Sequence, residues 1–136
     1  MPLEEIINRQ GIIISAPASG AGKTTVTLGL INAFARNRSV QPFKSGPDYI
    51  DSKFQSVAAD RPSYNLDTWA MSSRDILNMI GMVAPSDICI AEGSMGLFDG
   101  VISKGAGGNG STADLASITN WPCLLYTSDA ADEHSW

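Results

Sequence analysis

The sequence has few cysteines and few basic residues, and both shortages limit what the protein can be. Its two cysteines, Cys89 and Cys123, lie too far apart for a metal knuckle or a CxxC redox pair. Nine lysines and arginines stand against 14 aspartates and glutamates, which gives a formal net charge of -5. The basic residues are scattered rather than gathered in a stripe, so we expect no nucleic-acid partner.

The chain also lacks a long hydrophobic run. The longest one, Gly11 to Ala18, is far short of the roughly 20 residues that cross a bilayer. The segment from Met1 to Gln10 does not have the basic start and apolar stretch of a secretory signal peptide. We therefore expect no membrane association and a cytoplasmic protein. A composition of 43% hydrophobic and 17% charged residues over 136 positions is typical of one folded domain.

Short apolar runs alternate with helical patterns along the chain. The β-branched run from Gly11 to Ala16 predicts a buried strand. Apolar residues then recur at helical spacing from Thr25 to Asn37, and a second strand is expected over Val40 to Lys44. Ser72 is expected to cap a helix over Arg74 to Val83. The remaining predicted elements are a strand over Asp87 to Ala91 with Glu92 at its tip, a mobile functional loop from Gly93 to Gly110, a helix over about Thr112 to Thr119 and a strand that begins near Trp121.

Strands that alternate with helices predict an α/β fold, in which a mainly parallel sheet carries helices on both faces. Ligands bind such sheets in the crevice at the carboxyl ends of the strands. The residues that follow each predicted strand are therefore the first candidates for function.

A glycine-rich segment joins the first predicted strand to the first predicted helix. Gly20 and Gly22 allow backbone N–H groups to turn toward an anion at the helix N-terminus. Lys23 would supply positive charge to the outer phosphates of ATP, and the Thr24 hydroxyl would coordinate Mg²⁺. The simpler alternative, a glycine-rich turn before a helix, is disfavoured by the strand and the amphipathic helix around the motif. We predict an ATP and Mg²⁺ site formed by Ser19, Gly20, Ala21, Gly22, Lys23, Thr24 and Thr25.

The loop departs from the commonest phosphate-binding pattern at Pro17 and from the pattern of the partitioning ATPases at Ala18. Pro17 stands where the pattern G-x-x-x-x-G-K has its first glycine. Ala18 stands where partitioning ATPases carry a signature lysine, which disfavours a regulatory ATPase that works by nucleotide-dependent dimerisation. A longer loop of this kind resembles the dethiobiotin synthetase-like group of P-loop NTPases, and this resemblance implies their fold.

Charged residues follow two of the other predicted strands. Lys44 ends one strand, Asp48 comes shortly after it, and Glu92 follows another strand. Because the carboxyl ends of parallel strands meet at one edge, we expect these residues to face Lys23. Asp48 and Glu92 are predicted to join Thr24 as Mg²⁺ ligands, directly or through water, and Lys44 to neutralise charge on a transferring phosphoryl group or a substrate carboxylate. A surface lysine and turn-forming aspartates remain as alternatives.

Four further blocks make the resemblance specific. They are QPFKSGPDYIDS at Gln41 to Ser52, NLDTWAM at Asn65 to Met71, AEGSMGLFDG at Ala91 to Gly100 and GSTADLA at Gly110 to Ala116. With the phosphate loop, these blocks resemble the amino-terminal domain of the cobyrinate a,c-diamide synthase family. The resemblance implies a ligase that uses ATP to activate the a and c carboxylates of cobyrinate or hydrogenobyrinate as acyl phosphates, in cobalamin biosynthesis. Ammonia, released from glutamine by a glutaminase domain, then gives the amides.

The same resemblance implies substrate-binding residues. Tyr49, Ile50, Asp51 and Asp99 would contact the tetrapyrrole and its phosphorylated intermediate. A related synthase acting on another macrocycle, such as nickel-sirohydrochlorin, remains open, and so does a non-enzymatic nucleotide-binding module. Cobyric acid synthase fits the FKSGPDYID block less well. Whether the chain forms a homodimer is also left open.

The domain boundaries follow from where the resemblance ends. We expect residues 1–122 to form a partial ATP-binding domain whose fold is incomplete at its C-terminus, with the glutaminase domain absent. The run from Cys123 to Glu133 resembles the translation of a sequencing-library adapter. We therefore expect residues 123–136 to be a non-native tail, with a divergent strand and polar tail as the alternative.

The phosphate loop gives a first testable prediction. In the complete protein, Lys23→Ala should abolish nucleotide binding, because the outer phosphates lose the full positive charge that faces them. Calorimetric titration with ATP measures this loss. Tight ATP binding by the variant would contradict the assignment of the loop.

Overall fold

The structure, a computed structural model, describes residues 9–16, 22–48, 50–96, 105, 108 and 110–125, and of residues 94–96 it describes the backbone alone. Within these residues the chain forms one sheet of five parallel strands in the order β3-β2-β4-β1-β5. The strands are β1 (Gly11–Ala16), β2 (Val40–Ser45), β3 (Tyr64–Leu66), β4 (Ile88–Gly96) and β5 (Cys123–Leu125). The α/β fold with a parallel sheet, predicted from the sequence, is confirmed.

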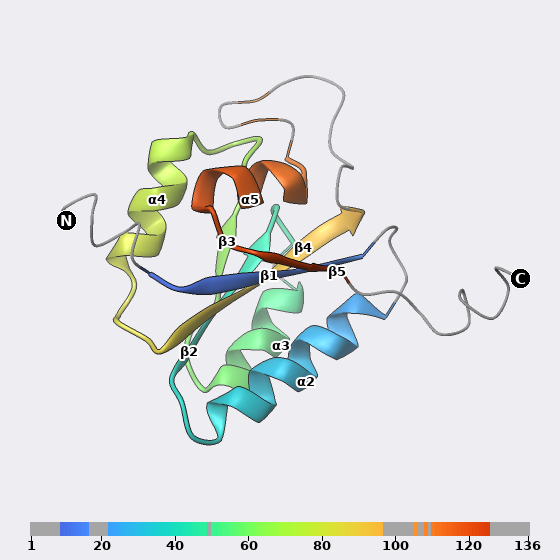
Figure 1. The fold of residues 1–136 in the computed structure, drawn as a ribbon, viewed down its shortest axis with the longest axis vertical. Helices are drawn as coiled ribbons and strands as arrows, with labels where there is room; N and C mark the ends of the chain where they lie inside the picture. Colours follow the sequence, from blue (N-terminus) through green and yellow to red (C-terminus); the bar gives the residue numbers. More distant parts are fainter. Residues whose placement is uncertain are drawn as a thin grey trace, which may run out of the picture.

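Two pairs of helices cover the two faces of this sheet (Figure 1). Helices α2 (Lys23–Ala35) and α3 (Ile50–Ala59) lie on one face, and α4 (Ser73–Met82) and α5 (Thr112–Thr119) lie on the other. Each pair buries its own hydrophobic cluster against the strands. The α4 and α5 side includes Ile76, Ile80 and Leu115, whereas the α2 and α3 side includes Ile31 and Ala59.

Consecutive strand residues contribute their side chains alternately to these two clusters. Ile13 packs on the α4 and α5 side and Ile14 on the α2 side, and both side chains are fully buried. The same alternation holds in β4, where Ile90 and Ala91 face opposite clusters. This follows from the two-residue period of a strand, and it explains why strands covered on both faces are apolar throughout.

The predicted boundaries of several elements match the structure closely. β1 and α5 have the predicted limits, β2 ends one residue later than predicted, and α2 and α4 differ from prediction by one or two residues at each end. Ser72 caps α4 as expected, since its side chain accepts a hydrogen bond from the Asp75 N–H while the Asp75 side chain accepts one from the Ser72 N–H. This reciprocal capping box fixes where the helix begins.

Two elements were not predicted, and one prediction was wrong. Helix α3 escaped notice because Phe54 and Val57 are exposed, which blurs its apolar stripe, and β3 is only three residues long. Glu92 was expected at the tip of its strand with a loop from Gly93 onward, but β4 continues to Gly96. The extension pairs with β1 through a register shift that places Ala16 opposite Gly96.

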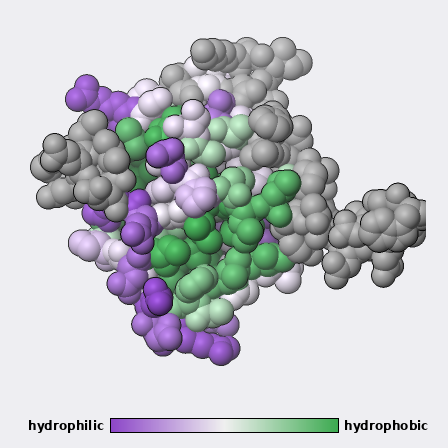
Figure 2. All heavy atoms as spheres, in the orientation of Figure 1, coloured by the Kyte–Doolittle hydropathy of each residue, from purple (hydrophilic) through white to green (hydrophobic). Residues whose placement is uncertain are grey.

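A hydrophobic surface covers the outer side of α2 and α3 (Figure 2). Phe54 and Val57 are 58% and 82% exposed there, beside a shallow groove lined by Leu28, Gly29, Asn32, Phe54, Val57 and Ala58. No helix among the described residues is long and apolar enough to cross a bilayer. The cytoplasmic location expected from the sequence stays a prediction.

The capping box of α4 can be tested directly. Ser72→Ala should lower the free energy of unfolding by about 1 kcal/mol, because the Asp75 N–H loses its acceptor at the helix start. Urea unfolding followed by circular dichroism measures the change. Ser73→Ala, one position further and exposed, is the matched control, and an equal effect of both substitutions would contradict the cap.

Candidate active site

Helix α2 begins at the carboxyl end of β1, where the sequence predicted a phosphate loop. Gly22 precedes the helix with φ 79° and ψ 16°, a left-handed conformation that glycine adopts without strain. Its carbonyl accepts the first helical hydrogen bond from Val26, at 3.2 Å. Because glycine has no side chain to cap the helix, the first N–H groups of α2 are suited to binding an anion.

Lys23, the first residue of α2, is only 8% exposed. Burial lowers the pKa of its ammonium group, and the positive charge of Lys44 lowers it further, against the opposing effect of Glu92 and Asp51. These surroundings therefore disfavour the charged form of the Lys23 side chain. A bound phosphate would offset both the desolvation and the repulsion between the two lysines.

A buried ion pair lies next to Lys23. Lys44 in β2 and Glu92 in β4 are direct partners in the parallel register of the two strands, and the Lys44 ammonium donates a hydrogen bond to Oε2 of Glu92. Glu92 is fully buried, and Lys44 is 3% exposed. The Lys44 Nζ atom also lies 3.2 Å from Oδ2 of Asp51, in the first turn of α3. Three elements thus contribute to one charged cluster.

The unused oxygen of Glu92 marks a place for a cation. The Thr24 hydroxyl donates to Oε2 of Glu92 at 3.3 Å, whereas Oε1, also buried, has no hydrogen-bond partner in the described part of the chain. A carboxylate oxygen and a hydroxyl are the hard ligands that Mg²⁺ prefers. The described residues contain no group of three or more histidine, cysteine, aspartate or glutamate side chains that could hold a metal. Magnesium sites of this class need few protein ligands, because phosphates and water fill the rest. Thr24 and Glu92 therefore fit Mg²⁺.

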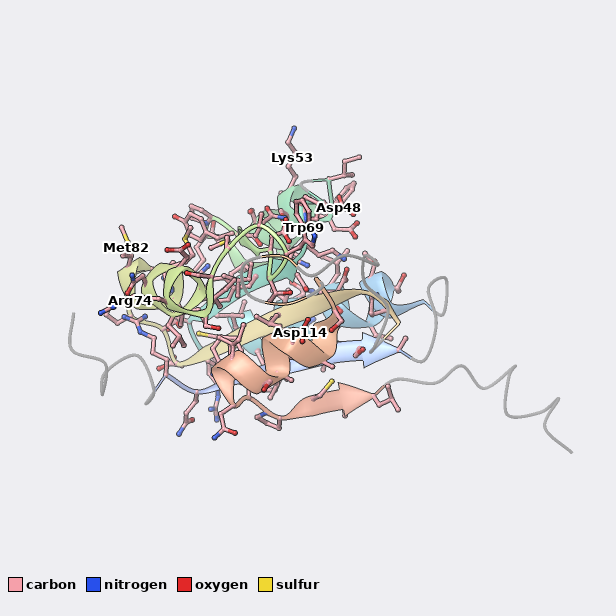
Figure 3. All side chains as sticks on the ribbon, turned by 90° about the horizontal axis from the view of Figure 1, so that it is seen from above. Asp48, Lys53, Trp69, Arg74, Met82 and Asp114 are labelled. Carbon is pink, nitrogen blue, oxygen red and sulfur yellow. The ribbon has the colours of Figure 1, made fainter. Side chains whose placement is uncertain are left out.

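Asp48 does not join this cluster among the described residues. Its side chain is exposed, and its Oδ1 accepts a hydrogen bond from the Ile50 N–H at 2.9 Å, at the start of α3. Figure 3 shows Asp48 on the α3 side of the sheet, near Lys53 and away from Asp114 on α5. The residue that reaches Lys44 is Asp51, three positions later. The metal-binding role of Asp48 stays a prediction.

The structure describes only some of the other predicted site residues. Thr25 is exposed in the first turn of α2, and Ile50 is 61% exposed at the start of α3. Their roles in binding nucleotide and tetrapyrrole stay predictions. Ser19, Gly20, Ala21, Tyr49 and Asp99 lie outside the described residues.

Sequence reasoning missed two polar residues beside the cluster. Asn65 in β3 lies opposite Lys44 in the parallel register, and Ser52 lies in α3. Both side chains contact the turn that joins β2 to α3. The position of Asn65 opposite Lys44 could have indicated its role. That position becomes apparent only once Tyr64–Leu66 are recognised as the strand β3.

Comparison with known proteins agrees with this geometry. Residues 12–117 match the family described as the CobQ/CobB/MinD/ParA nucleotide binding domain. The chain therefore belongs to this family of nucleotide-binding domains, as its phosphate loop and parallel sheet predict.

The curated relatives are more specific. The chain is 50% identical to hydrogenobyrinate a,c-diamide synthase of Rhodobacter capsulatus over 117 residues, which cover 85% of this chain and 27% of the relative. It is 45% identical to the synthase of the same name from Brucella ovis over 129 residues, or 93% of this chain and 29% of the relative. It is 47% identical to cobyrinate a,c-diamide synthase of Picrophilus torridus over 116 residues, or 84% and 26%. No solved structure matches the chain.

These relatives confirm the resemblance to the a,c-diamide synthases that the sequence blocks indicated. The chain spans between a quarter and a third of the length of these relatives. The glutaminase domain expected from the resemblance, the domain limit at residue 122 and the non-native origin of residues 123–136 stay predictions. Of that last segment, Cys123–Leu125 form the edge strand β5, and residues 126–136 lie outside the described residues.

The buried ion pair gives a stability prediction. Lys44→Met should lower the free energy of unfolding by about 3 kcal/mol, because it leaves the buried Glu92 carboxylate without its cation. The double variant Lys44→Met with Glu92→Gln should recover most of that loss, because neither side chain then carries a charge. Urea unfolding of the two variants measures both effects.

Lys53→Met is the matched control for this experiment. Lys53 is an exposed lysine on α3, so its loss should change stability little. If Lys44→Met were as mild as the control, or the double variant worse than the single one, the buried pair would not contribute as described.

Proposed function

We propose that the chain is the ATP-binding part of a ligase that converts the a and c carboxylates of hydrogenobyrinate or cobyrinate into amides. The observation that carries the proposal is the cluster of Lys44, Glu92 and Asp51 beside Lys23 at the start of α2. Such a cluster suits a reaction between a nucleotide phosphate and an organic acid. The names of the relatives, hydrogenobyrinate and cobyrinate a,c-diamide synthase, supply the identity of the acid.

The proposed reaction has two steps. A carboxylate oxygen of the corrinoid precursor attacks the terminal phosphorus of ATP, so that an acyl phosphate forms and ADP leaves. Ammonia then attacks the acyl carbon, and the carbon–oxygen bond to phosphate breaks to give the amide and inorganic phosphate. The ammonia would come from glutamine, through a glutaminase domain in the complete protein.

Each charged residue has a role that follows from its position. Lys23 and the first N–H groups of α2 bind the outer phosphates, where preorganised positive charge stabilises the transferring phosphoryl group. Thr24 and Glu92 would hold Mg²⁺, which would neutralise phosphate charge. Lys44 attracts the incoming carboxylate and is held in place by Glu92 and Asp51.

The corrinoid lies on the α3 side of this cluster in the proposal. Ile50 and Asp51 are the first two residues of α3, so this helix start is taken as the part nearest to the carboxylate that reacts. Tyr49 is assigned to the same side on the basis of the resemblance. Asp99 is assigned to the same substrate side on the basis of the resemblance, whereas Asp48 is assigned to Mg²⁺ because it follows β2. The position of the macrocycle would decide whether the a or the c carboxylate reacts first.

The proposal is tested in a complete enzyme. We suggest replacing the matched 117-residue stretch of the Rhodobacter capsulatus relative with the corresponding residues of this chain. With hydrogenobyrinate, ATP, Mg²⁺ and glutamine, mass spectrometry should detect the diamide, and ADP release should require the tetrapyrrole. The chimeric enzyme with Lys23→Ala is the negative control.

Three other results would contradict the proposal. ADP release that does not depend on any tetrapyrrole carboxylate would indicate a regulatory ATPase. Amidation of nickel-sirohydrochlorin in place of hydrogenobyrinate would indicate the related synthase of another macrocycle. Nucleotide binding without amide or ADP formation under any of these conditions would indicate a non-enzymatic binding module.

A further inference from the structure

One side chain holds the turn that joins β2 to α3. The side-chain amide of Asn65, in the edge strand β3, donates hydrogen bonds to the carbonyl oxygens of Gly46 and Asp48, both at 2.8 Å. The Ser52 hydroxyl lies 3.2 Å from the remaining oxygen of this amide and 3.3 Å from the Asp48 carbonyl oxygen, so these two acceptors share its one proton. Both N–H groups and the oxygen of Asn65 are therefore engaged with the segment between β2 and the first turn of α3.

The turn needs such support because its backbone is unusual. Gly46 is buried and adopts φ 84°, a left-handed conformation, and its N–H donates to the carbonyl of Leu66 at 3.0 Å. The carbonyls of Gly46 and Asp48 point toward β3 and not along a regular ladder. The hydrogen bond to the Gly46 carbonyl is part-buried, and such a carbonyl is costly without a donor, so the Asn65 amide stabilises this path of the chain.

The path of this turn decides which acid reaches Lys44. Lys44 is the next-to-last residue of β2, and Asp51 is the second residue of α3, so the turn between them sets the distance from Nζ to Oδ2, which is 3.2 Å. Ser52, the neighbour of Asp51, is tied to the same amide. A shift of the turn would move the start of α3 away from the end of β2 as one unit.

We infer that Asn65 is a positioning residue for the ligase reaction: by fixing the turn at Gly46 and Asp48, it keeps Asp51 in contact with Lys44. This inference rests on the proposed function, because it concerns the reaction that Lys44 and Asp51 support. Asn65 touches no reacting atom itself and acts through the backbone that it holds.

The sharpest variant is Asn65→Asp in the complete chimeric enzyme described above. Aspartate has nearly the same shape, but its carboxylate has no N–H groups and would face two carbonyl oxygens. The turnover number for diamide formation should fall about 100-fold, as misplacement of a reacting group by about 1 Å would cause. The dissociation constant for ATP should stay unchanged, because Lys23 and the N-terminus of α2 follow β1 and not β2.

Two further variants complete the experiment. Asn78→Asp makes the same chemical change at an exposed position in the middle of α4 and should leave turnover unchanged. Ser52→Ala removes the hydroxyl that binds the Asn65 oxygen, and it should lower turnover less than Asn65→Asp does while leaving ATP affinity unchanged. Ser52→Ala also tests the inference if the Asn65→Asp variant does not fold.

The outcomes separate this inference from the proposed function. Full turnover in folded Asn65→Asp, or in Ser52→Ala when the first variant does not fold, would overturn the inference and leave the ligase assignment intact. Equal losses of ATP affinity and turnover would show a general structural role and would also overturn it. An unsubstituted chimera that binds ATP but forms no diamide would overturn the proposed function itself.

Discussion

The site depends on a buried ion pair between two neighbouring strands. Taking the charges of Lys44 and Glu92 out of water costs several kcal/mol for each ion, and the two side chains are nearly inaccessible to solvent. An apolar pair of similar volume is often as stable or more so. Stability alone therefore does not account for these charges. We interpret the pair as holding the Lys44 ammonium group in one orientation near the carboxyl ends of the strands, where parallel sheets bind their ligands.

The helices on one face of the sheet place Lys23 and Asp51 near the same carboxyl ends of the strands. α2 begins with Lys23 and α3 contributes Asp51 from its first turn, so both helix N-termini and their partial positive charge lie near the ion pair. Two lysines and two carboxylates then share one region, and burial together with the charge of Lys44 lowers the pKa of Lys23. In the proposed function, phosphates would offset the lysines, and a cation would offset the Glu92 oxygen that has no partner among the described residues.

Prediction from the sequence succeeded where the signal was local. The apolar run of β1, the start of α2 after Gly22 and the start of α4 at Ser72 with Asp75 were each predicted from a few adjacent residues. Local patterns failed for α3 and β3. Glu92 was placed at a strand tip because the glycine-rich stretch from Gly93 to Gly110 has no clear periodicity, yet the strand continues to Gly96. An added Cβ at Gly93 would lie 2.4 Å from the Thr112 hydroxyl. Glycine here permits close packing against α5 and does not break the strand.

The sequence by itself determined the alternation of strands and helices, the family, and the edge of the sheet where Lys23, Lys44 and Glu92 would be found. Only the tertiary structure decided that Lys44 and Glu92 are direct partners, that Asp51 and not Asp48 contacts Lys44, and that Asn65 holds the turn between them. The physical reason is register. A one-residue shift between strands sends a side chain to the opposite face of the sheet, and the pairing of strands distant in sequence is set by packing of the whole core.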